Sequence, residues 1–219
     1  TKALGARALV IGPAPVGGAI TGSRIPCLLE ALEAGLDLIA GLHTRLAETP
    51  ELRAAALRLG RHLIDVRTPP PGLPVATARK RAGKRLLTVG TDCALGKKYT
   101  ALAIARAFVA RGVACDFRAT GQTGILISGA GVPIDSVVAD FIAGAAESLS
   151  PDAAPDHWDV VEGQGALLHP AYAGVSLGLL HGSQPDVIVA CHEVGRPHLL
   201  GFPHMPTPSL EEVIELNLT

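Results

Sequence analysis

The chain has 219 residues, of which 48% are hydrophobic and 18% are charged, and its formal net charge at pH 7 is −1. This length is enough to bury a sizeable core and to form one large or two smaller domains. Because the charges nearly balance, the composition argues against a general binder of nucleic acid or of membrane surfaces. We therefore expect a small-molecule substrate, with neither nucleic acid nor membrane as a partner.

The cysteines and the apolar runs indicate the compartment. Four cysteines lie far apart and form no C-x-x-C pair, which predicts neither a zinc site nor a disulfide framework: Cys27, Cys93, Cys115 and Cys191. No metal is expected, and free thiols suit a reducing, cytoplasmic compartment. No secretory signal opens the chain, and Gly, Pro and His interrupt its longest weakly charged run. The low charge content favours a subunit interface, and hence a homo-oligomer.

Apolar strands alternate with helices in the first third of the chain. Strands are predicted over 7–12, 36–41 and 62–66, and helices over 25–34 and 50–59. This alternation predicts a parallel sheet in a first domain spanning residues 1–68. The loop 12–18 resembles a dinucleotide fingerprint only loosely, because it holds two prolines and no helix follows at once. A simple strand-end loop is the favoured interpretation.

A proline-rich connector follows the first domain. Pro69, Pro70, Pro71 and Pro74 fix the backbone in an extended form, so residues 69–85 are expected to be a stiff linker. The basic patch at its end, 79–85, has two interpretations. It is either a solvated linker, which we favour, or a contact for extra phosphates of a bound cofactor.

A second α/β unit is predicted over residues 86–219. Its expected elements are strands 86–90, 113–118, 158–162 and 186–191 and helices 97–111 and 135–147. Such repeats form a three-layer α/β/α fold with a mainly parallel sheet, and ligands bind at the carboxyl ends of the strands. We expect the loops 90–98, 119–124 and 162–170 to meet there. A capping-box pattern at Ser209 and Glu212 starts a helix without a stop signal, so we expect this domain to be truncated at its C-terminus.

The most informative motif lies where strand 86–90 runs into an alanine-rich helix. Gly90, Gly96 and Lys97 resemble the phosphate-binding pattern G-x-x-x-x-G-K, in which backbone N–H groups and the lysine hold phosphate oxygens. Lys98 stands where Ser or Thr normally binds Mg²⁺, and Thr100 faces another direction on the helix, so Mg²⁺ is not expected. The predicted cofactor-binding residues are Gly90, Thr91, Asp92, Cys93, Ala94, Gly96, Lys97, Lys98 and Thr100.

The end of strand 158–162 carries the second informative motif. Glu162 ends a buried strand and is followed by glycines, so its carboxylate is a candidate to hold a metal, accept a proton or bind a substrate ammonium. His169 titrates near neutral pH and is the second catalytic candidate. A structural carboxylate and a core histidine are the alternatives. The residues predicted to bind substrate are Thr120, Gly121, Gln122, Thr123, Gly163 and Gln164.

The histidines near the end of the chain do not form a peptidase motif. His192-Glu193 is followed by a histidine only at His198, too late for the H-E-x-x-H pattern. Arg196 follows the last predicted strand and is either a surface residue or a partner for a substrate carboxylate.

These motifs carry a family resemblance. The loop Gly90–Lys97 and the strand end Glu162-Gly163-x-Gly165 look like those of dethiobiotin synthetase and its relatives. With Lys98, the block 157–165 and the His169-Pro170 pair added, the chain more closely resembles the D-glutamate N-acetyltransferase family, long catalogued as a domain of unknown function. The resemblance covers both halves. It implies a Rossmann-like N-terminal domain joined to a P-loop NTPase-like domain.

The resemblance also implies an activity, namely transfer of an acetyl group from acetyl-CoA to the amine of a D-amino acid such as D-glutamate. A loop with two lysines suits the phosphates of coenzyme A, while Glu162 or His169 would act as general base. N–H groups of the Gly121 or Gly163 loops would stabilise the oxyanion. Three alternatives stay open: a Mg-ATP-dependent ligase or kinase with Asp92 and Glu162 as metal ligands, a non-catalytic sensor, and a covalent acetyl-enzyme on Cys93.

Overall fold

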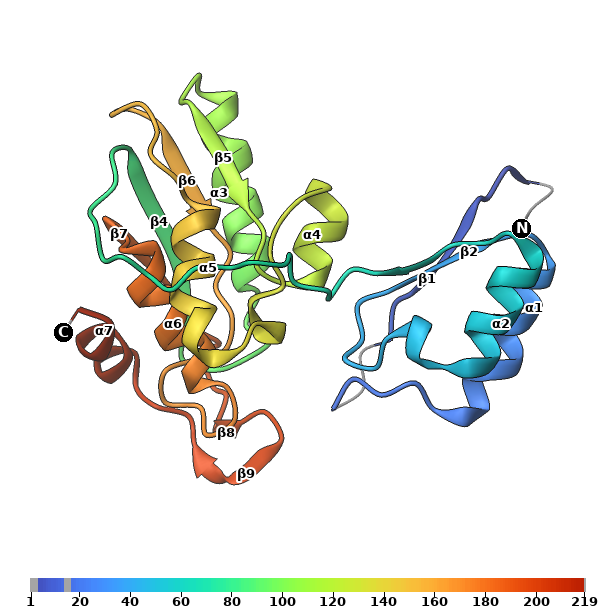
Figure 1. Ribbon diagram of the computed structural model, residues 1–219. Helices are drawn as coiled ribbons and strands as arrows, with labels where there is room; N and C mark the ends of the chain where they lie inside the picture. Colours follow the sequence, from blue (N-terminus) through green and yellow to red (C-terminus); the bar gives the residue numbers. More distant parts are fainter. Residues whose placement is uncertain (1–3, 14–16, 219) are drawn as a thin grey trace. The chain divides into compact units, whose positions relative to one another are not determined.

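A computed structural model describes residues 4–13 and 17–218 of the chain, which divides into two compact units between Thr68 and Pro69 (Figure 1). Among the described residues, no helix combines the length and the apolar character that crossing a membrane requires.

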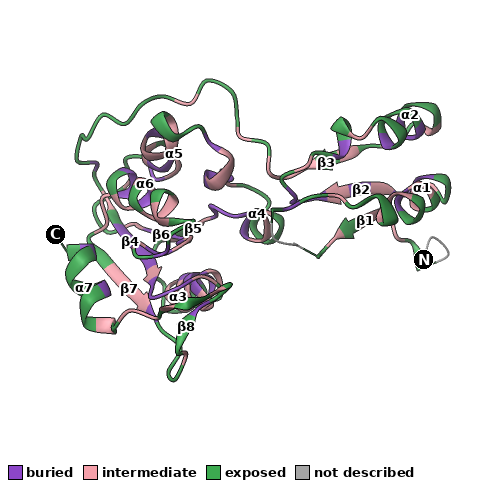
Figure 2. Cartoon of the chain, turned by 90° about the horizontal axis from the view of Figure 1, so that it is seen from below, coloured by how far each residue is buried: buried purple, intermediate pink, exposed green. Residues whose placement is uncertain are grey.

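The first unit is a three-stranded parallel sheet with helices on one face. Strands β1 (Ala8–Ile11), β2 (Asp37–Ala40) and β3 (Leu63–Asp65) lie in the order β1-β2-β3. Helices α1 (Ile25–Glu33) and α2 (Pro50–Leu59) pack side by side over the same face, where Leu38 and Ala40 are buried (Figure 2). Leu38 and Ala40 alternate along β2 with half-buried neighbours, as expected for a strand covered on one face.

The predicted elements of this unit are confirmed to within about two residues at each end. Helix α2 starts with Pro50 at its first turn and ends at Gly60, whose left-handed conformation (φ 61°) suits glycine. Among the described residues after β1, the first α-helix is α1, which starts at Ile25. The prediction for the loop 12–18 falls partly on residues 14–16, which lie outside the described residues.

The second unit is a four-stranded parallel sheet between two helical layers. Its strands are β4 (Lys84–Gly90), β5 (Cys115–Arg118), β6 (Trp158–Val161) and β7 (Val187–Cys191), in the order β5-β6-β4-β7. Helix α3 (Lys97–Ala110) covers the face that carries Leu86 and Val160. Helices α5 (Ile142–Leu149) and α6 (Ala173–Ser183) cover the other face (Figure 1).

Smaller elements complete this unit. Strands β8 (His198–Leu199) and β9 (Phe202–Pro206) form an antiparallel hairpin, helix α7 (Leu210–Leu218) contacts β7, and a short helix α4 (Gln122–Ser128) follows β5. The predicted α/β class is confirmed, with a mainly parallel sheet in each unit.

Helix prediction was wrong in the middle of the second unit. The segment predicted as one helix, 135–147, begins with two 3₁₀ turns, Ile134–Ser136 and Ala139–Phe141, and α5 starts only at Ile142. Val137 and Val138 interrupt it because both have extended ψ angles near 138°, as β-branched residues readily do. Helices α4 and α6 were not predicted. In α6, Gly178 and Gly182 interrupt the apolar pattern by which a helix is recognised in a sequence. Both glycines allow α6 to pack closely on α5, because a Cβ at either position would lie 2.1 Å from an atom of α5.

Two residues of the basic patch 79–85 differ from the favoured prediction of a solvated linker. Arg81 and Arg85 are buried. The Arg81 guanidinium donates to the carbonyls of Gly182 (2.8 Å) and Ser183 (2.9 Å), and that of Arg85 donates to the Arg81 carbonyl (3.0 Å). Burial lowers the pKa of Arg81. These guanidiniums therefore anchor the chain to the second unit and have carbonyl partners in place of water.

Candidate functional site

The carboxyl ends of the parallel strands in the second unit bring together the loops predicted to meet. β4 pairs with β7 through to Gly90 and Cys191, and β6 with both β4 and β5. Hydrogen bonds connect the loop after β6 to the loop after β5 through Glu162 and Thr120, and to β4 through Gly163 and Thr88. Ligands of α/β proteins bind at this edge of the sheet, which is therefore the candidate site.

The phosphate loop has the backbone of an anion-binding turn. Ala94 (φ 53°) and Gly96 (φ 90°) are left-handed, and α3 begins at Lys97. Five residues separate Gly90 from Gly96, one more than in the pattern G-x-x-x-x-G-K. The buried Lys97 Nζ donates to the Asp92 carbonyl at 2.7 Å, and burial lowers the pKa of Lys97. The ammonium group of Lys97 therefore lies at the centre of the loop.

The neighbouring side chains of the first turn of α3 point elsewhere. Lys98 Nζ lies 4.4 Å from the centre of the Tyr99 ring. The Thr100 hydroxyl lies 3.6 Å from the Cys191 thiol, which donates to it. Lys98 is half-buried, and its positive charge favours the ionised form of Glu162.

Asp92 is a buried carboxylate that accepts three hydrogen bonds. Its Oδ1 accepts from the Cys93 N–H at 2.6 Å, and its Oδ2 accepts from Arg196 Nη1 and from the Leu200 N–H, both at 2.8 Å. Burial disfavours the ionised form, but the hydrogen bonds from Leu200, Arg196 and Cys93 outweigh it, so the pKa of Asp92 lies below its ordinary value. Asp92 therefore joins the phosphate loop to the segment that follows β7.

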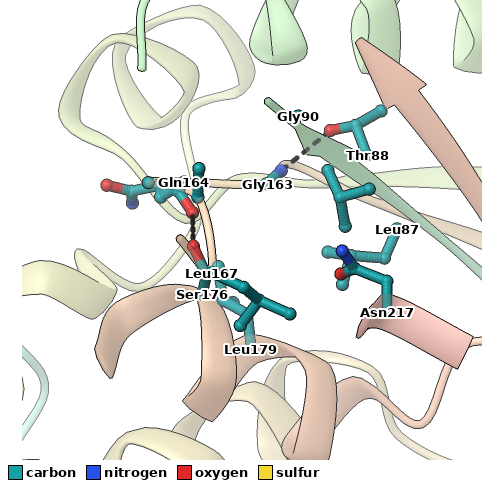
Figure 3. Close-up of a pocket in the computed structure, with 12 residues that line it drawn as sticks. Leu87, Thr88, Gly90, Gly163, Gln164, Leu167, Ser176, Leu179 and Asn217 are labelled. Atoms are coloured by element: carbon teal, nitrogen blue, oxygen red, sulfur yellow. Dashed lines mark hydrogen bonds between the residues drawn. The ribbon is translucent and has the colours of Figure 1, made fainter. Parts of the chain in front are cut away.

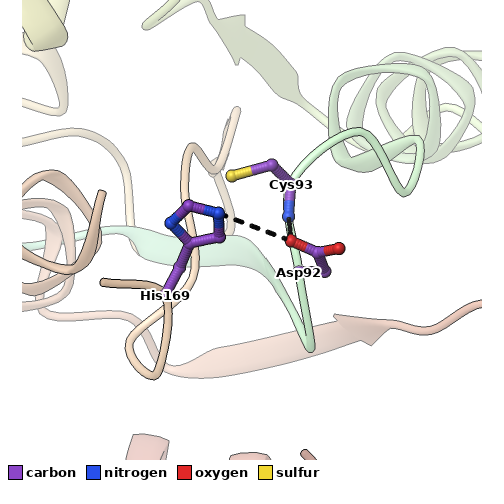
Figure 4. Close-up of side chains that lie close together, drawn as sticks. All are labelled: Asp92, Cys93 and His169. Atoms are coloured by element: carbon purple, nitrogen blue, oxygen red, sulfur yellow. Dashed lines mark hydrogen bonds and ion pairs between the residues drawn. The ribbon is translucent and has the colours of Figure 1, made fainter. Parts of the chain in front are cut away.

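His169 is buried with one ring nitrogen already committed. Its ring stacks on Tyr172 and meets the edge of Phe202. Nδ1 accepts from the Ala171 N–H at 3.2 Å, so the neutral ring carries its proton on Nε2, which lies 3.8 Å from Asp92 Oδ1 (Figure 4). Burial lowers the pKa of His169, which keeps the ring neutral. In this tautomer Nε2 is a donor and has no lone pair for a proton or a metal.

Cys93 lies beside His169 and Asp92, and the three ligand atoms are all within 4.8 Å of one another. Burial raises the pKa of the Cys93 thiol, and the His169 tautomer leaves no base to deprotonate it. The cluster therefore fits neither a thiolate–imidazole metal site nor an activated nucleophile. A second cluster of possible ligands, Asp116, His157 and Asp159, is bridged by the Arg118 guanidinium.

Glu162 lies under the start of α4. Its Oε2 accepts from the N–H groups of Thr120 (2.9 Å) and Gly121 (3.1 Å). Burial raises the pKa of Glu162 even though these hydrogen bonds and the charge of Lys98 favour ionisation. A Cβ at Gly124 would lie 2.1 Å from Oε2, so the glycine makes room for the carboxylate. A buried carboxylate with a raised pKa is a stronger base than an exposed one, as a general base requires.

Gly163 and Gln164 line a small cavity beside Thr88 (Figure 3). The Gly163 N–H donates to Thr88 Oγ1 at 2.9 Å, and a Cβ on Gly163 would lie 1.5 Å from the Thr88 carbonyl oxygen. The cavity has a volume of about 10 Å³, room for about one water molecule, and no charged residue in its lining, which also includes Gly90, Ser176 and Asn217. Ligand pockets usually span roughly 300–1,000 Å³. This cavity is therefore too small for a coenzyme.

The other predicted substrate-binding residues lie nearby in different roles. Thr120 donates through its hydroxyl to the Glu162 carbonyl (2.6 Å), and the Gln164 amide donates to the Thr120 carbonyl. Gln122 and Thr123 form the first turn of α4. The N–H groups of Gly121 and Gly163 are engaged with Glu162 and Thr88, so in this conformation neither is directed at an oxyanion.

Two contributions to the site were missed from the sequence. Arg196 pairs with Asp92 in place of solvent or a substrate carboxylate, and its Nη1 also donates to the Cys93 carbonyl at 3.0 Å. His192 Nδ1 lies 3.2 Å from Thr91 Oγ1 in the phosphate loop. Both residues follow β7 closely, and β7 pairs with the strand that leads into the phosphate loop. Residues just past such a strand are expected near the ligand site, and this position could have identified both of them from the sequence.

Strand β4, the glycine loop, Lys97 and helix α3 define a P-loop protein, with a carboxylate at the end of the neighbouring strand. Residues 74–219 match the P-loop domain of DUF1611, a domain of unknown function, and residues 1–69 match its Rossmann-like N-terminal domain. The chain belongs to the DUF1611 family. The predicted Rossmann-like and P-loop domains are confirmed by these matches.

Individual relatives extend over nearly the whole chain. It is 53% identical to proteins named D-glutamate N-acetyltransferase from Pseudoalteromonas sp (over 215 residues, 98% of this chain) and from Tritonibacter scottomollicae (217 residues, 99%). A crystal structure of a DUF1611 family protein from Anabaena variabilis is 45% identical, with a TM-score of 0.89 over 96% of this chain. The chain spans 65% of each of the first two proteins and 62% of the third. The family resemblance drawn from the motifs is confirmed.

Proposed function

We propose that the intact protein is an N-acetyltransferase that moves the acetyl group of acetyl-CoA to the amine of a D-amino acid such as D-glutamate. The observation that carries this proposal is the 53% identity, over 98% or more of this chain, to two proteins named D-glutamate N-acetyltransferase. The aligned span covers nearly the whole chain and therefore includes the phosphate loop and the strand ends around it.

The phosphate loop is the proposed binding element for coenzyme A. The diphosphate and the 3′-phosphate of coenzyme A carry several negative charges. Backbone N–H groups at the start of α3 and the ammonium groups of Lys97 and Lys98 are suited to bind these charges. Lys97 would exchange its contact with the Asp92 carbonyl for a phosphate oxygen. The cavity beside Gly163 has room for about one water molecule and is therefore too small for the coenzyme.

Glu162 is the proposed general base, in preference to His169. The His169 lone pair accepts from the Ala171 N–H, whereas Glu162 has its second oxygen, Oε1, free of the two loop N–H groups that hold Oε2. The substrate ammonium would lose one proton to Glu162, and the amine would then attack the thioester carbonyl carbon. As the C–N bond forms and the C–S bond breaks, a second proton goes to the sulfur, giving the N-acetyl amino acid and free CoA.

A thiol-release assay on the intact protein tests the proposal. Acetyl-CoA is incubated with D-glutamate or with L-glutamate, in the presence of EDTA, and free CoA thiol is measured together with N-acetylglutamate. We expect both products in equal amounts with D-glutamate and much slower release with the L-isomer. Product formation from neither isomer, or thiol release without N-acetylglutamate, would contradict the proposed transfer.

A further inference from the structure

The three positions at which a P-loop protein presents ligands to Mg²⁺ are either substituted or partly engaged by hydrogen bonds in this chain. The residue after the loop lysine is Lys98, an ammonium in place of a hydroxyl. The carboxylate at the end of β6, Glu162, accepts two loop N–H groups through Oε2. The loop carboxylate, Asp92, accepts three hydrogen bonds. The residues present therefore do not fit the divalent cation that this fold usually binds.

The positive charge nearest the Asp92 carboxylate is a guanidinium. Arg196 Nη1 lies 2.8 Å from Asp92 Oδ2 and 3.0 Å from the Cys93 carbonyl, so a single nitrogen holds both the side chain and the backbone of the phosphate loop. The Arg196 side chain is 15% exposed and the Asp92 side chain 0%. Arg196 Nη2 is held in turn by Glu193. The ion pair is thus built into the loop and largely shielded from water.

We propose that this phosphate loop binds its anion without a divalent cation, and that Arg196 is the resident cation that neutralises Asp92 and positions the loop. Arg196 is a positioning residue, since it acts on the ligand through Asp92 and the Cys93 carbonyl. The inference rests on the proposed function in one respect, namely that the anion is a phosphate of acetyl-CoA.

The energetic role of Arg196 follows from burial. Without Arg196, the Asp92 charge would be uncompensated in a nearly dry site and would repel a phosphate approaching the same loop. A lysine at 196 would restore the charge but not the geometry of the guanidinium. Removal of both charges by pairing Asp92→Asn with Arg196→Met would remove the repulsion. The double variant should therefore bind an anion better than Arg196→Met alone.

The test is a titration of acetyl-CoA into the intact protein, in EDTA and in excess Mg²⁺, for the wild type and four variants. We expect equal wild-type affinity in both buffers. Arg196→Met should weaken binding at least about tenfold, with partial recovery in Arg196→Lys and in the Asp92→Asn/Arg196→Met double variant. Arg106→Met, an exposed arginine on α3, is the matched control and should bind as the wild type does.

Several results would overturn the inference. They are tighter wild-type binding in Mg²⁺, unchanged binding by Arg196→Met, and a double variant no better than Arg196→Met. If Arg196→Met does not fold, the inference is tested by two other measurements: the wild-type affinity for acetyl-CoA with and without Mg²⁺, and the affinity of Arg196→Lys. Metal-independent binding of acetyl-CoA without thiol release on D-glutamate would contradict the proposed function alone and leave this inference standing. Binding of Mg-ATP but not of acetyl-CoA would overturn both.

Discussion

The two units of the chain use similar parallel sheets but differ in what they bury. In the first unit, the described buried residues are apolar, such as Leu32, Leu38 and Leu52, apart from Gly41 and Gly18 in loops. In the second, the interior also contains Thr88, Asp92, Lys97, Glu162 and His169. Burying a polar or charged group costs free energy unless it is well paired. These five residues lie at the carboxyl ends of the strands or in the loops beyond them, whereas the buried Arg81 and Arg85 anchor the start of the unit through carbonyl groups.

The comparison is sharpest at two strand ends that carry a carboxylate. Asp65 ends β3 and accepts from the Leu46 N–H at 2.8 Å, while Glu162 follows β6 and accepts from two N–H groups. Only Glu162 is buried, and only it lies beside a phosphate loop. In the first unit, hydrogen bonding between a strand-end carboxylate and the backbone fixes a connecting segment. In the second unit, the same kind of hydrogen bond positions the carboxylate that we propose as the proton acceptor.

The largest expected effect is loss of turnover in Glu162→Gln. The amide keeps the shape of the side chain but cannot take a proton, so kcat should fall by about 10²–10⁴ with KM for acetyl-CoA little changed. Asp65→Asn is the matched control and should leave kcat unchanged. Wild-type activity should rise with pH as Glu162 loses its proton, with a midpoint above the ordinary pKa of 4.5, because burial raises this pKa. Equal turnover in the two variants would remove the distinction between the strand ends.

A large effect on stability is expected from Asp92→Asn. Breaking a buried ion pair should cost about 3 kcal/mol in the free energy of unfolding measured with denaturant. Glu33→Gln breaks the exposed pair between Glu33 and Arg58 in the first unit and should cost less than about 1 kcal/mol. Similar losses in both variants would show that the Asp92 pair does not differ from a surface pair.

The pH dependence of stability gives a second readout on Asp92. Its pKa in the folded state lies below the ordinary 3.8, so the ionised carboxylate stabilises the fold above that pH. This contribution should be lost as the pH falls below 3.8 through the folded-state value. Asp92→Asn should therefore show a shallower loss of stability in acid than the wild type, and an unchanged slope would contradict the assignment.

A smaller effect is expected from alanine at two glycines that follow strands. In Gly163→Ala the new Cβ would overlap the Thr88 carbonyl, so β6 and β4 must shift apart, at a cost of about 1–3 kcal/mol. Gly12 follows β1 and has open space around it, so Gly12→Ala should change stability by less than about 0.5 kcal/mol. Thermal unfolding of both variants checks the pair, and comparable destabilisation would contradict the difference in packing.

Much of the fold could be predicted because apolar strands such as 86–90 and the helix at Lys97 depend on local patterns. Helix α6 could not, since its glycines matter only through packing against α5. The motif glycines and Glu162 were located correctly at the strand ends. The pairing of Asp92 with Arg196 was not predictable, because the two residues are more than a hundred positions apart in the sequence. The tautomer of His169 was not predictable either, because it depends on a single backbone N–H group.

We infer that the P-loop of the second unit binds the phosphates of acetyl-CoA, and a titration can test this role of the loop. Acetyl-CoA is titrated calorimetrically into the intact wild-type protein and into Lys97→Met, which removes the ammonium at the centre of the loop. Loss of a charged hydrogen bond to phosphate predicts at least about tenfold weaker binding by the variant. Equal affinity of the two proteins for acetyl-CoA would contradict the claim and would place the coenzyme elsewhere.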